Sequence, residues 1–557
     1  MDTRSSSHKI SSGQILLVGA VTCALLSPFL GKAFHIDDTL FLKAAVQIRH
    51  TPWDFYGFPV NWYGWEMPMS EVNQNPPLVA YLIAGISALI GSNEVSLHIA
   101  FMGVAVAATL GAWRLARLFC GNTLAAALLL AVSPAFLVTS TNLMTDTTML
   151  AFFLWGLACW MDGLNSGGWL ACLLSVLFIS LATLTKYFGI MALPLLGMLT
   201  IARGKRFDLR LLLLLLPLGT LFGFDYYTKI LYGHGLFSSA AAYSSALKNE
   251  RAPVDYWQKL CSGLSFTGGC QIFYLFYAPF LYPRRQLLLV GGVGMALVAS
   301  LVLASGEIGS VPIYVSGSIR WPQLIQFTLF IFAGAAILVQ SLSDCLLRRD
   351  SESLFLCCWI AGTFIFTTFV NWSTNARTVL PMVPAVAMVV VRQFEFHRTG
   401  RTLADSSSPP LWPLLPCAIL SLMVAWADMT FANSQREAAR LIMDIYGKGR
   451  GTVWFQGHWG FQYYMEQAGA RPIDFNTTRI QSGDVLVVPE NNTNTREPLP
   501  GMFQRLSEIT LKSFPFLATM DSVSLGAGFY SDVWGALPFS FGETLPENYF
   551  IYSFVPH

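Results

Sequence analysis

Two adjacent carboxylates, Asp37 and Asp38, follow the first long apolar run of the chain in the stretch "FHIDDTLFLKAA", residues 34–45. A carboxylate at a membrane surface can act as a general base and take the proton of a hydroxyl group. A structural alternative exists, because Asp37 precedes an amphipathic helical pattern and suits the N-cap of that helix. The cap explains one carboxylate and gives Asp38 no role, so both interpretations stay open.

Three further charged residues stand at the ends of apolar segments. They are Asp146 in "LMTDTTML", Lys186 in "LTKYFG" and Arg377 in "NWSTNARTVLP". Asp146 also suits a helix N-cap, and a lysine or arginine at a helix end commonly reaches for the membrane interface. If all these groups converge on one membrane face, the cations can hold a phosphate while a carboxylate activates a hydroxyl.

The composition indicates that membrane helices position these groups. Of the 557 residues, 54% are hydrophobic and 12% are charged, about half the usual charged share of a soluble chain. The net charge of +2 gives no basic excess to follow a nucleic-acid backbone, so we expect no nucleic-acid partner. Membrane lipids are the expected surroundings.

The apolar segments predict an all-α polytopic membrane bundle. A spanning helix needs roughly 17–25 largely apolar residues, and about thirteen segments meet this length. The expected spans are 15–32, 95–118, 122–140, 145–162, 168–184, 186–202, 209–231, 268–283, 286–304, 321–343, 352–371, 376–392 and 411–430.

Basic residues orient these spans, since they gather in cytoplasmic loops. They fall between alternate pairs of spans if the N-terminus is cytoplasmic and residues 76–91 do not cross. Residues 1–430 then form the membrane domain, with residues 33–94 as an outer loop that carries amphipathic helices. The basic residues used are Arg114, Arg117, Arg203, Lys205, Arg206, Arg210, Arg284, Arg285, Arg348, Arg349, Arg392, Arg398 and Arg401.

Residues 431–557 change character and are expected outside the cytoplasm. "GTVWFQG" and "DVLVVPE" are typical of strands, and "FQYYMEQAG" between them is typical of a helix, so a small α/β domain is predicted. Cys261 and Cys270 in "CSGLSFTGGC" fall at the end of a second outer loop, where a disulfide is possible in an oxidising compartment.

The order of these motifs resembles that of the GT-C glycosyltransferases, and it is similar to that of protein O-mannosyltransferases and of the lipid A aminoarabinose transferase. The shared features within residues 10–395 are the acidic pair, the Pro-Pro-Leu that closes the first loop, "SPAFL…MTD…FF", "LTK" and "AR…LP…P". The resemblance implies a sugar transfer from a polyprenyl-phosphate donor to a hydroxyl or phosphate of a lipid, glycan or protein acceptor. It also implies that the reaction takes place at the outer face of a bacterial-type inner membrane.

The resemblance assigns roles to individual residues. Asp37 is the expected base, with Asp38 and Asp146 positioning substrates, while Arg377 and Lys186 bind the donor phosphate. Asn75 departs from the family pattern, because relatives often carry Lys or His before Pro-Pro-Leu. An asparagine there donates a hydrogen bond to substrate without adding charge.

No cofactor is expected, because a polyprenyl phosphate is itself a good leaving group. Asp37 and Asp38 could hold a divalent ion, but adjacent carboxylates without a further acidic motif are a poor ligand set.

Two other functions compete with this interpretation. A transporter or flippase of lipid-linked sugars would place charged groups near the bilayer midplane. The middle of the predicted spans is nearly free of charge, which favours chemistry at the surface. The second alternative is an inactive scaffold whose outer domain binds a partner.

Overall fold

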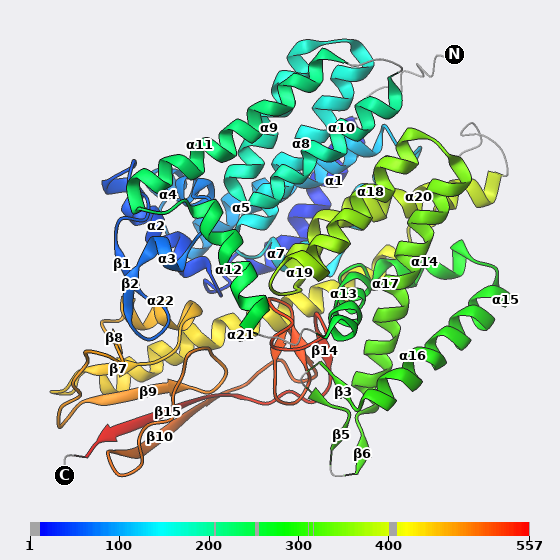
Figure 1. Cartoon of the computed structure of the whole chain (residues 1–557). Helices are drawn as coiled ribbons and strands as arrows, with labels where there is room; N and C mark the ends of the chain where they lie inside the picture. The colour runs from blue at the N-terminus through cyan, green and yellow to red at the C-terminus, as the bar shows by residue number, and fades with distance from the viewer. Residues whose placement is uncertain are drawn as a thin grey trace.

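The computed structural model describes residues 12–204, 208–250, 255–309, 311–315, 317–399 and 409–555. Most of these residues form helices, and a sheet-containing region follows at the C-terminal end (Figure 1). Within this part of the chain, nine helical segments are long and apolar enough to cross a membrane. They are Ser12–Phe29, Glu94–Ala116, Thr145–Ser166, Leu209–Tyr232, Arg284–Ser305, Trp321–Arg348, Ser351–Val370, Ala376–Glu395 and Leu414–Tyr446.

The predicted number of thirteen spans is not confirmed. Nine predicted spans coincide with the long apolar helices, and two more coincide with shorter ones, Trp169–Thr185 and Tyr187–Arg203. The remaining two, 122–140 and 268–283, are interrupted. The first divides into α6 (Thr123–Ala131) and α7 (Pro134–Thr139), because Ser133 caps a new helix whose first residue is a proline.

The helix that precedes the second interruption excludes the predicted disulfide. The helix α13 (Tyr256–Cys270) contains both Cys261 and Cys270, and both are free thiols. Nine helical steps separate their Cα atoms by roughly 13 Å, about twice the distance that a disulfide spans. The prediction of a disulfide between Cys261 and Cys270 is therefore wrong.

Glycines in this segment form a close helix contact, where the sequence predicted the end of an outer loop. A Cβ placed on Gly268 would lie 2.1 Å from Phe330 O, and a Cβ on Gly334 would lie 2.1 Å from Leu264 O. The glycines thus let α13 pack backbone to backbone against α17 (Trp321–Arg348). The chain continues into α14 (Phe273–Leu281) after a short break.

The spans differ in how much of their surface is covered by protein. The segment Ala376–Glu395 is almost entirely buried, whereas Arg284–Ser305 is strongly apolar and exposes most of its side chains. An apolar helix that is open on most sides suits contact with lipid. The arrangement fits a multi-pass membrane protein.

The first predicted outer loop contains three helices and a small hairpin. It comprises α2 (Asp38–His50), β1 (Pro59–Asn61), β2 (Glu66–Pro68), α3 (Met69–Val72) and α4 (Leu78–Ile90). The predicted amphipathic helix is present as α2, which buries Leu40, Phe41, Ala44, Ala45 and Ile48 along one side. This helix packs against α4 and α22 (Trp459–Gln467), so the loop is attached to the C-terminal region.

A five-stranded sheet confirms that the C-terminal region has a sheet-containing domain. The strand order is β10-β15-β9-β7-β8, with antiparallel pairing from β10 to β9 and parallel pairing from β9 to β8. The predicted strands are present as β7 and β9, with α22 between them in sequence. The bounds are β7 (Val453–Phe455), β8 (Arg471–Pro472), β9 (Val485–Pro489), β10 (Phe503–Leu511) and β15 (Glu547–Phe554).

The helix α21 (Leu414–Tyr446) belongs to both regions. It continues without a break past Thr430, and its C-terminal half packs Ala438, Ala439 and Ile442 into the core beneath the sheet. Figure 1 shows this yellow helix extending from the bundle to the strands. The membrane bundle and the C-terminal domain therefore share one continuous element.

A second contact joins the C-terminal residues to the bundle. Gln326 on α17 donates to Phe539 O at 2.6 Å and accepts from Phe541 N at 3.0 Å. These bonds hold the hairpin-rich segment that contains β11 (Leu517–Ala518) and β14 (Ser540–Phe541) against the helices.

Candidate active site

An ion pair joins Asp37, the predicted base, to Arg377. Arg377 Nη1 lies 3.3 Å from Asp37 Oδ2. Arg377 stands on the short helix α19 (Ala376–Val379), whose start is capped by Asn375. Asp37 occupies the N-cap position of α2, but its side chain makes no cap hydrogen bond. The cap interpretation is therefore wrong for the Asp37 carboxylate, which faces a cation.

Asp38 has a different environment from its neighbour. Its side chain is buried, with Oδ2 accepting from His35 N at 3.0 Å and Oδ1 accepting from Leu143 N at 2.9 Å. Burial raises the pKa of Asp38 to about 7, against the opposing effect of these backbone donors. Asp38 thus ties the turn before α2 to the loop before α8 (Thr145–Ser166), which holds the backbone of Asp37 in place.

Asp146 and Lys186 form a second ion pair beside the first. Asp146 is buried in the first turn of α8, and Lys186 Nζ contacts its Oδ1 from the end of α9 (Trp169–Thr185). The N-cap position of α8 belongs to Met144, so Asp146 is not the cap. Asp146 and Asp37 are the two carboxylates that attract the Arg377 guanidinium most strongly. The structure therefore brings together Asp37, Asp146, Lys186 and Arg377, the four charged residues that were expected to converge.

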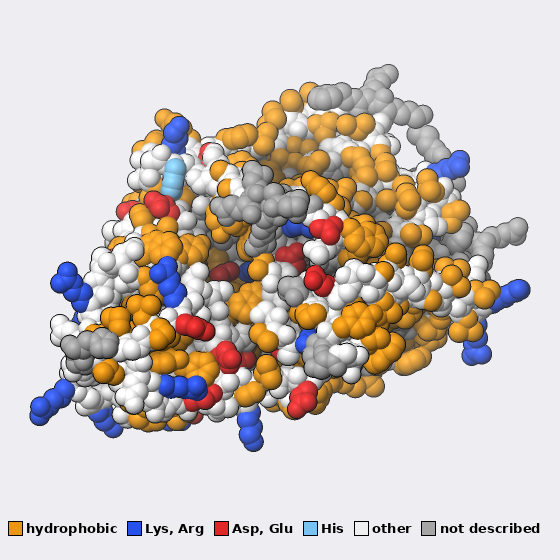
Figure 2. Space-filling model, turned by 60° about the horizontal axis from the view of Figure 1, so that its bottom comes forward, with side chains coloured by type: hydrophobic (Ala, Val, Ile, Leu, Met, Phe, Trp, Pro, Cys, Tyr) orange, Lys and Arg blue, Asp and Glu red, His pale blue; other side chains and the backbone are white. Residues whose placement is uncertain are grey.

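This group of charges remains open to a ligand. The exposed side-chain fractions are 34% for Asp37, 21% for Lys186 and 18% for Arg377, against 1% for Asp146. Figure 2 shows a hollow in one face of the molecule, with acidic and basic side chains in and around it. Two accessible cations and one accessible carboxylate can bind an anion and exchange a proton at the same place.

Asn75 lies in the loop next to this group. Asn73 Oδ1 accepts from the backbone N and from Nδ2 of Asn75, at 3.1 Å and 2.9 Å. The neighbouring Gln74 O accepts from Tyr187 Oη at 2.8 Å, and Tyr187 directly follows Lys186. The hydrogen bond from Tyr187 thus holds the loop beside Lys186, while the Asn75 side-chain amide donates to Asn73.

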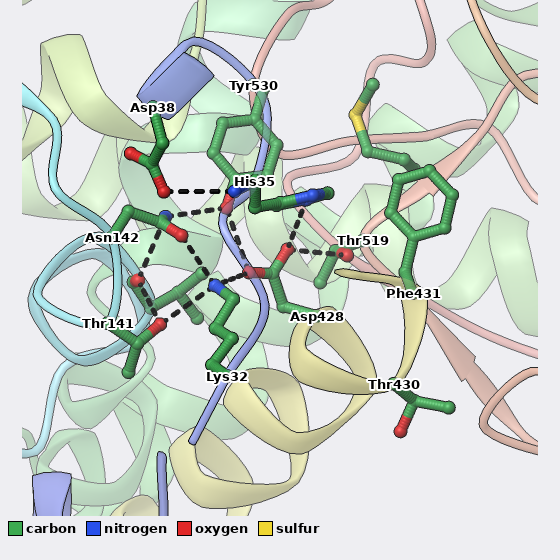
Figure 3. Close-up of polar contacts among 12 residues, drawn as sticks. Lys32, His35, Asp38, Thr141, Asn142, Asp428, Thr430, Phe431, Thr519 and Tyr530 are labelled. Atoms are coloured by element: carbon green, nitrogen blue, oxygen red, sulfur yellow. Dashed lines mark hydrogen bonds and ion pairs between the residues drawn. The ribbon is translucent and has the colours of Figure 1, made fainter. Parts of the chain in front are cut away.

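A buried polar network behind the site was missed by sequence reasoning. Lys32 Nζ donates to Asp428 Oδ2 at 2.5 Å, and both side chains are fully buried. Figure 3 shows Asn142, Thr141, Thr519 and Tyr530 directed at this pair. The bonds are Lys32 Nζ to Asn142 Oδ1 at 2.6 Å, Lys32 Nζ to Thr141 Oγ1 at 3.0 Å, Thr519 Oγ1 to Asp428 Oδ1 at 3.0 Å and Tyr530 Oη to Asp428 Oδ2 at 2.8 Å.

His35 lies against this network as a neutral imidazole. Its Nε2 is 3.7 Å from Asp428 Oδ1, too far for a hydrogen bond. Burial lowers the pKa of His35 to about 3, and the attraction of Asp428 is offset by the repulsion of Lys32 and Arg377. A charged residue inside an apolar span is a signal in itself, and Asp428 falls within the predicted span 411–430.

A divalent ion does not fit the adjacent carboxylates. The oxygens of Asp38 accept two backbone N–H groups, whereas Asp37 turns toward Arg377. Across the ranges described above, no group of three or more His, Cys, Asp and Glu side chains could hold a metal ion.

Comparison with known proteins gives one family match. Residues 74–224 match the model of the family described as dolichyl-phosphate-mannose-protein mannosyltransferase. The chain is similar to the GT-C glycosyltransferases. The matched region contains Asn75, Asp146 and Lys186. No curated protein matches the chain.

Several solved structures of GT-C glycosyltransferases are similar to the chain at low identity. The oligosaccharyltransferase from Archaeoglobus fulgidus is 14% identical with a TM-score of 0.48, and the match covers 83% of this chain and 64% of that one. ArnT from Cupriavidus metallidurans is 14% identical with a TM-score of 0.41, covering 86% and 92%. The arabinofuranosyltransferase AftD from Mycobacteria is 12% identical with a TM-score of 0.39, covering 98% and 42%. The chain thus spans less than two thirds of the archaeal enzyme's length.

Proposed function

We propose that the chain transfers a sugar from a polyprenyl-phosphate carrier to an acceptor hydroxyl at the outer face of a bacterial-type inner membrane. The observation that carries this proposal is the Asp37–Arg377 ion pair beside the Asp146–Lys186 ion pair. The family description names a dolichyl-phosphate sugar as donor, and such a donor belongs to the polyprenyl-phosphate class.

The two cations suit the phosphate of such a donor. The Arg377 guanidinium offers a planar fork of donors that can bind a phosphate bidentately, and Lys186 adds a second charge. The two carboxylates already present neutralise these cations in the ligand-free protein. An arriving phosphate therefore competes with Asp37 for Arg377.

This competition couples donor binding to the chemistry. When the phosphate takes over Arg377, the Asp37 carboxylate loses its cation partner and is free to face the acceptor hydroxyl. Asp37 then accepts the acceptor's hydroxyl proton while the acceptor oxygen forms a bond to the anomeric carbon of the sugar. The bond from that carbon to the phosphate oxygen breaks, and its electron pair leaves with the polyprenyl phosphate. The reaction needs no redox cofactor.

A transporter of lipid-linked sugars is less well supported. The Lys32–Asp428 pair lies within the helical part, but both side chains have 0% exposure and satisfy one another. A fully buried ion pair of this kind has a structural role, whereas a transport path needs charged groups that a substrate can reach.

The test is to compare cells that carry the wild-type chain, the Asp37→Asn variant or no copy of the chain. Mass spectrometry of their envelope lipids, glycans and glycoproteins should show a sugar-modified species with the wild type, and not with Asp37→Asn or without the chain. The Asp444→Asn variant is the matched control and should keep the wild-type profile, because Asp444 is exposed on α21 and belongs to neither ion pair of the site. Identical envelope profiles in all four strains would overturn the proposal.

A further inference from the structure

A strap from the C-terminal domain, residues 529–532, runs beside the arginine loop, residues 373–377. The two segments are held together along their length, so the arginine loop is fixed from the C-terminal side. Three hydrogen bonds join them: Ala376 N to Phe529 O at 2.9 Å, Asp532 N to Thr374 O at 2.8 Å, and Ser373 Oγ with Ser531 Oγ at 2.7 Å.

The strap also places an aromatic ring next to Arg377. The guanidinium carbon of Arg377 lies 5.6 Å from the centre of the Tyr530 ring. Tyr530 is buried at 4% exposure, where a cation–π contact is stronger than at the surface. The ring therefore offers Arg377 a partner that carries no charge.

The hydroxyl of Tyr530 holds this ring in one orientation. Tyr530 Oη donates to Asp428 Oδ2 at 2.8 Å and accepts from Asn142 Nδ2 at 2.8 Å. Figure 3 shows Tyr530 above the Lys32–Asp428 pair, with its hydroxyl directed into the network. The buried network is thus connected through Tyr530 to the arginine of the candidate site.

We propose that Tyr530 is a positioning residue for Arg377, so that the C-terminal domain completes the donor-phosphate site. This inference rests on the proposed function. Asp37 must release Arg377 when a phosphate arrives, and the Tyr530 ring then remains as the partner that keeps the guanidinium in place. An arginine that is already ordered loses less rotamer freedom on binding, which favours affinity.

The experiment measures the affinity of the full-length protein in lipid nanodiscs for undecaprenyl phosphate. Tyr530→Leu removes the ring and should weaken binding roughly tenfold, the scale of a desolvated cation–π contact. Tyr530→Phe keeps the ring and should stay within about threefold of the wild type. The control Tyr552→Leu removes a half-buried tyrosine on β15 of the same domain and should leave the affinity unchanged.

A double-mutant cycle separates positioning from general stability. In an Arg377→Ala background, Tyr530→Leu should cause little further loss of affinity, because the residue acts through the arginine. If Tyr530→Leu does not fold, Tyr530→Met takes its place in the same cycle, since a flexible methionine fills irregular space without offering a ring face.

Three outcomes overturn the inference, and the last of them can be told apart from the first two. If Arg377→Ala weakens binding while the Tyr530 variants match the wild type, or if the two losses add fully, Tyr530 does not position the arginine. If the wild type and Tyr552→Leu bind no undecaprenyl phosphate, the proposed function is wrong, and the inference that rests on it is wrong as well.

Discussion

Arg377 Nη1 and Asp37 Oδ2 lie 3.3 Å apart, although the two residues are separated by 340 positions in the sequence. Their partnership brings the start of α2 against the start of α19 and leaves both groups partly exposed. The site is therefore assembled from distant parts of the chain, and each partner can be removed separately.

Replacing Asp37 by Asn removes the proposed base with almost no change in volume. Turnover should fall by roughly two to four orders of magnitude, the usual scale for losing general-base assistance. The rate of product formation in membranes, followed by mass spectrometry, checks this expectation. A variant that transfers sugar at the normal rate would exclude Asp37 as the base.

Replacing Arg377 by Ala should weaken phosphate binding more than replacing it by Lys, since lysine keeps the charge but not the bidentate fork. Binding of undecaprenyl phosphate to the purified protein is the measurement. Arg440→Ala is the control, because Arg440 is 59% exposed on α21 and pairs with Glu437. Equal affinities for Arg377→Ala and Arg440→Ala would contradict the assignment.

Replacing Asp428 by Ala leaves Lys32 buried without its counter-ion. Loss of one partner of a buried pair should lower the free energy of unfolding by about 3–5 kcal/mol. The double variant Lys32→Met/Asp428→Leu should recover most of that loss, because apolar side chains of similar size need no partner. Equilibrium unfolding in mixed micelles tests both, and Asp444→Ala, 62% exposed on the same helix, should stay within about 0.5 kcal/mol of the wild type.

His35 makes the free energy of unfolding depend on pH. Its pKa is about 3 in the folded protein and about 6.5 when unfolded, so below pH 6.5 the unfolded chain binds a proton that the folded protein does not. Stability therefore falls as the pH is lowered through this window. Between pH 6 and pH 4, His35→Gln should lose roughly 2–3 kcal/mol less than the wild type. His50→Gln, at an exposed position ending α2, should reproduce the wild-type slope.

The orientation of the chain is open to a direct test. The basic loops predict a cytoplasmic N-terminus and an outer location for the segment after Thr430. Reporter fusions after residues 205 and 400 should give cytoplasmic signals, and a fusion after residue 450 should give an outer one. A cytoplasmic signal at 450 would require a different number of crossings.

Much of the site could be predicted because it follows a motif order along the chain. Asp37, Asp146, Lys186 and Arg377 each stand at the end of an apolar segment, and a helical bundle brings such ends to a common face. The two ion pairs among them agree with that expectation. The segments that contain them were also predicted, since hydropathy over a span length is a strong signal.

The missed features depend on contacts that no local pattern records. Lys32 and Asp428 lie 396 positions apart, and although a charge inside an apolar span stands out, the neighbours of neither residue identify its partner. Tyr530 sits in a segment of short strands, where nothing in the sequence points to Arg377. The disulfide failed because α13 continues as a helix through Cys270, where the sequence predicted the end of a loop, and Gly268 and Gly334 let this helix pack closely against α17.

Because Lys32 and Asp428 are far apart in the sequence, Lys32 is synthesised well before its partner. At roughly 5–20 residues per second, the ribosome needs on the order of 20–80 s to reach Asp428 after Lys32 has left it. During that interval a cation destined for complete burial has no counter-ion, so it must stay hydrated near the membrane surface. The first helix can settle into its final depth only after the last one has been inserted.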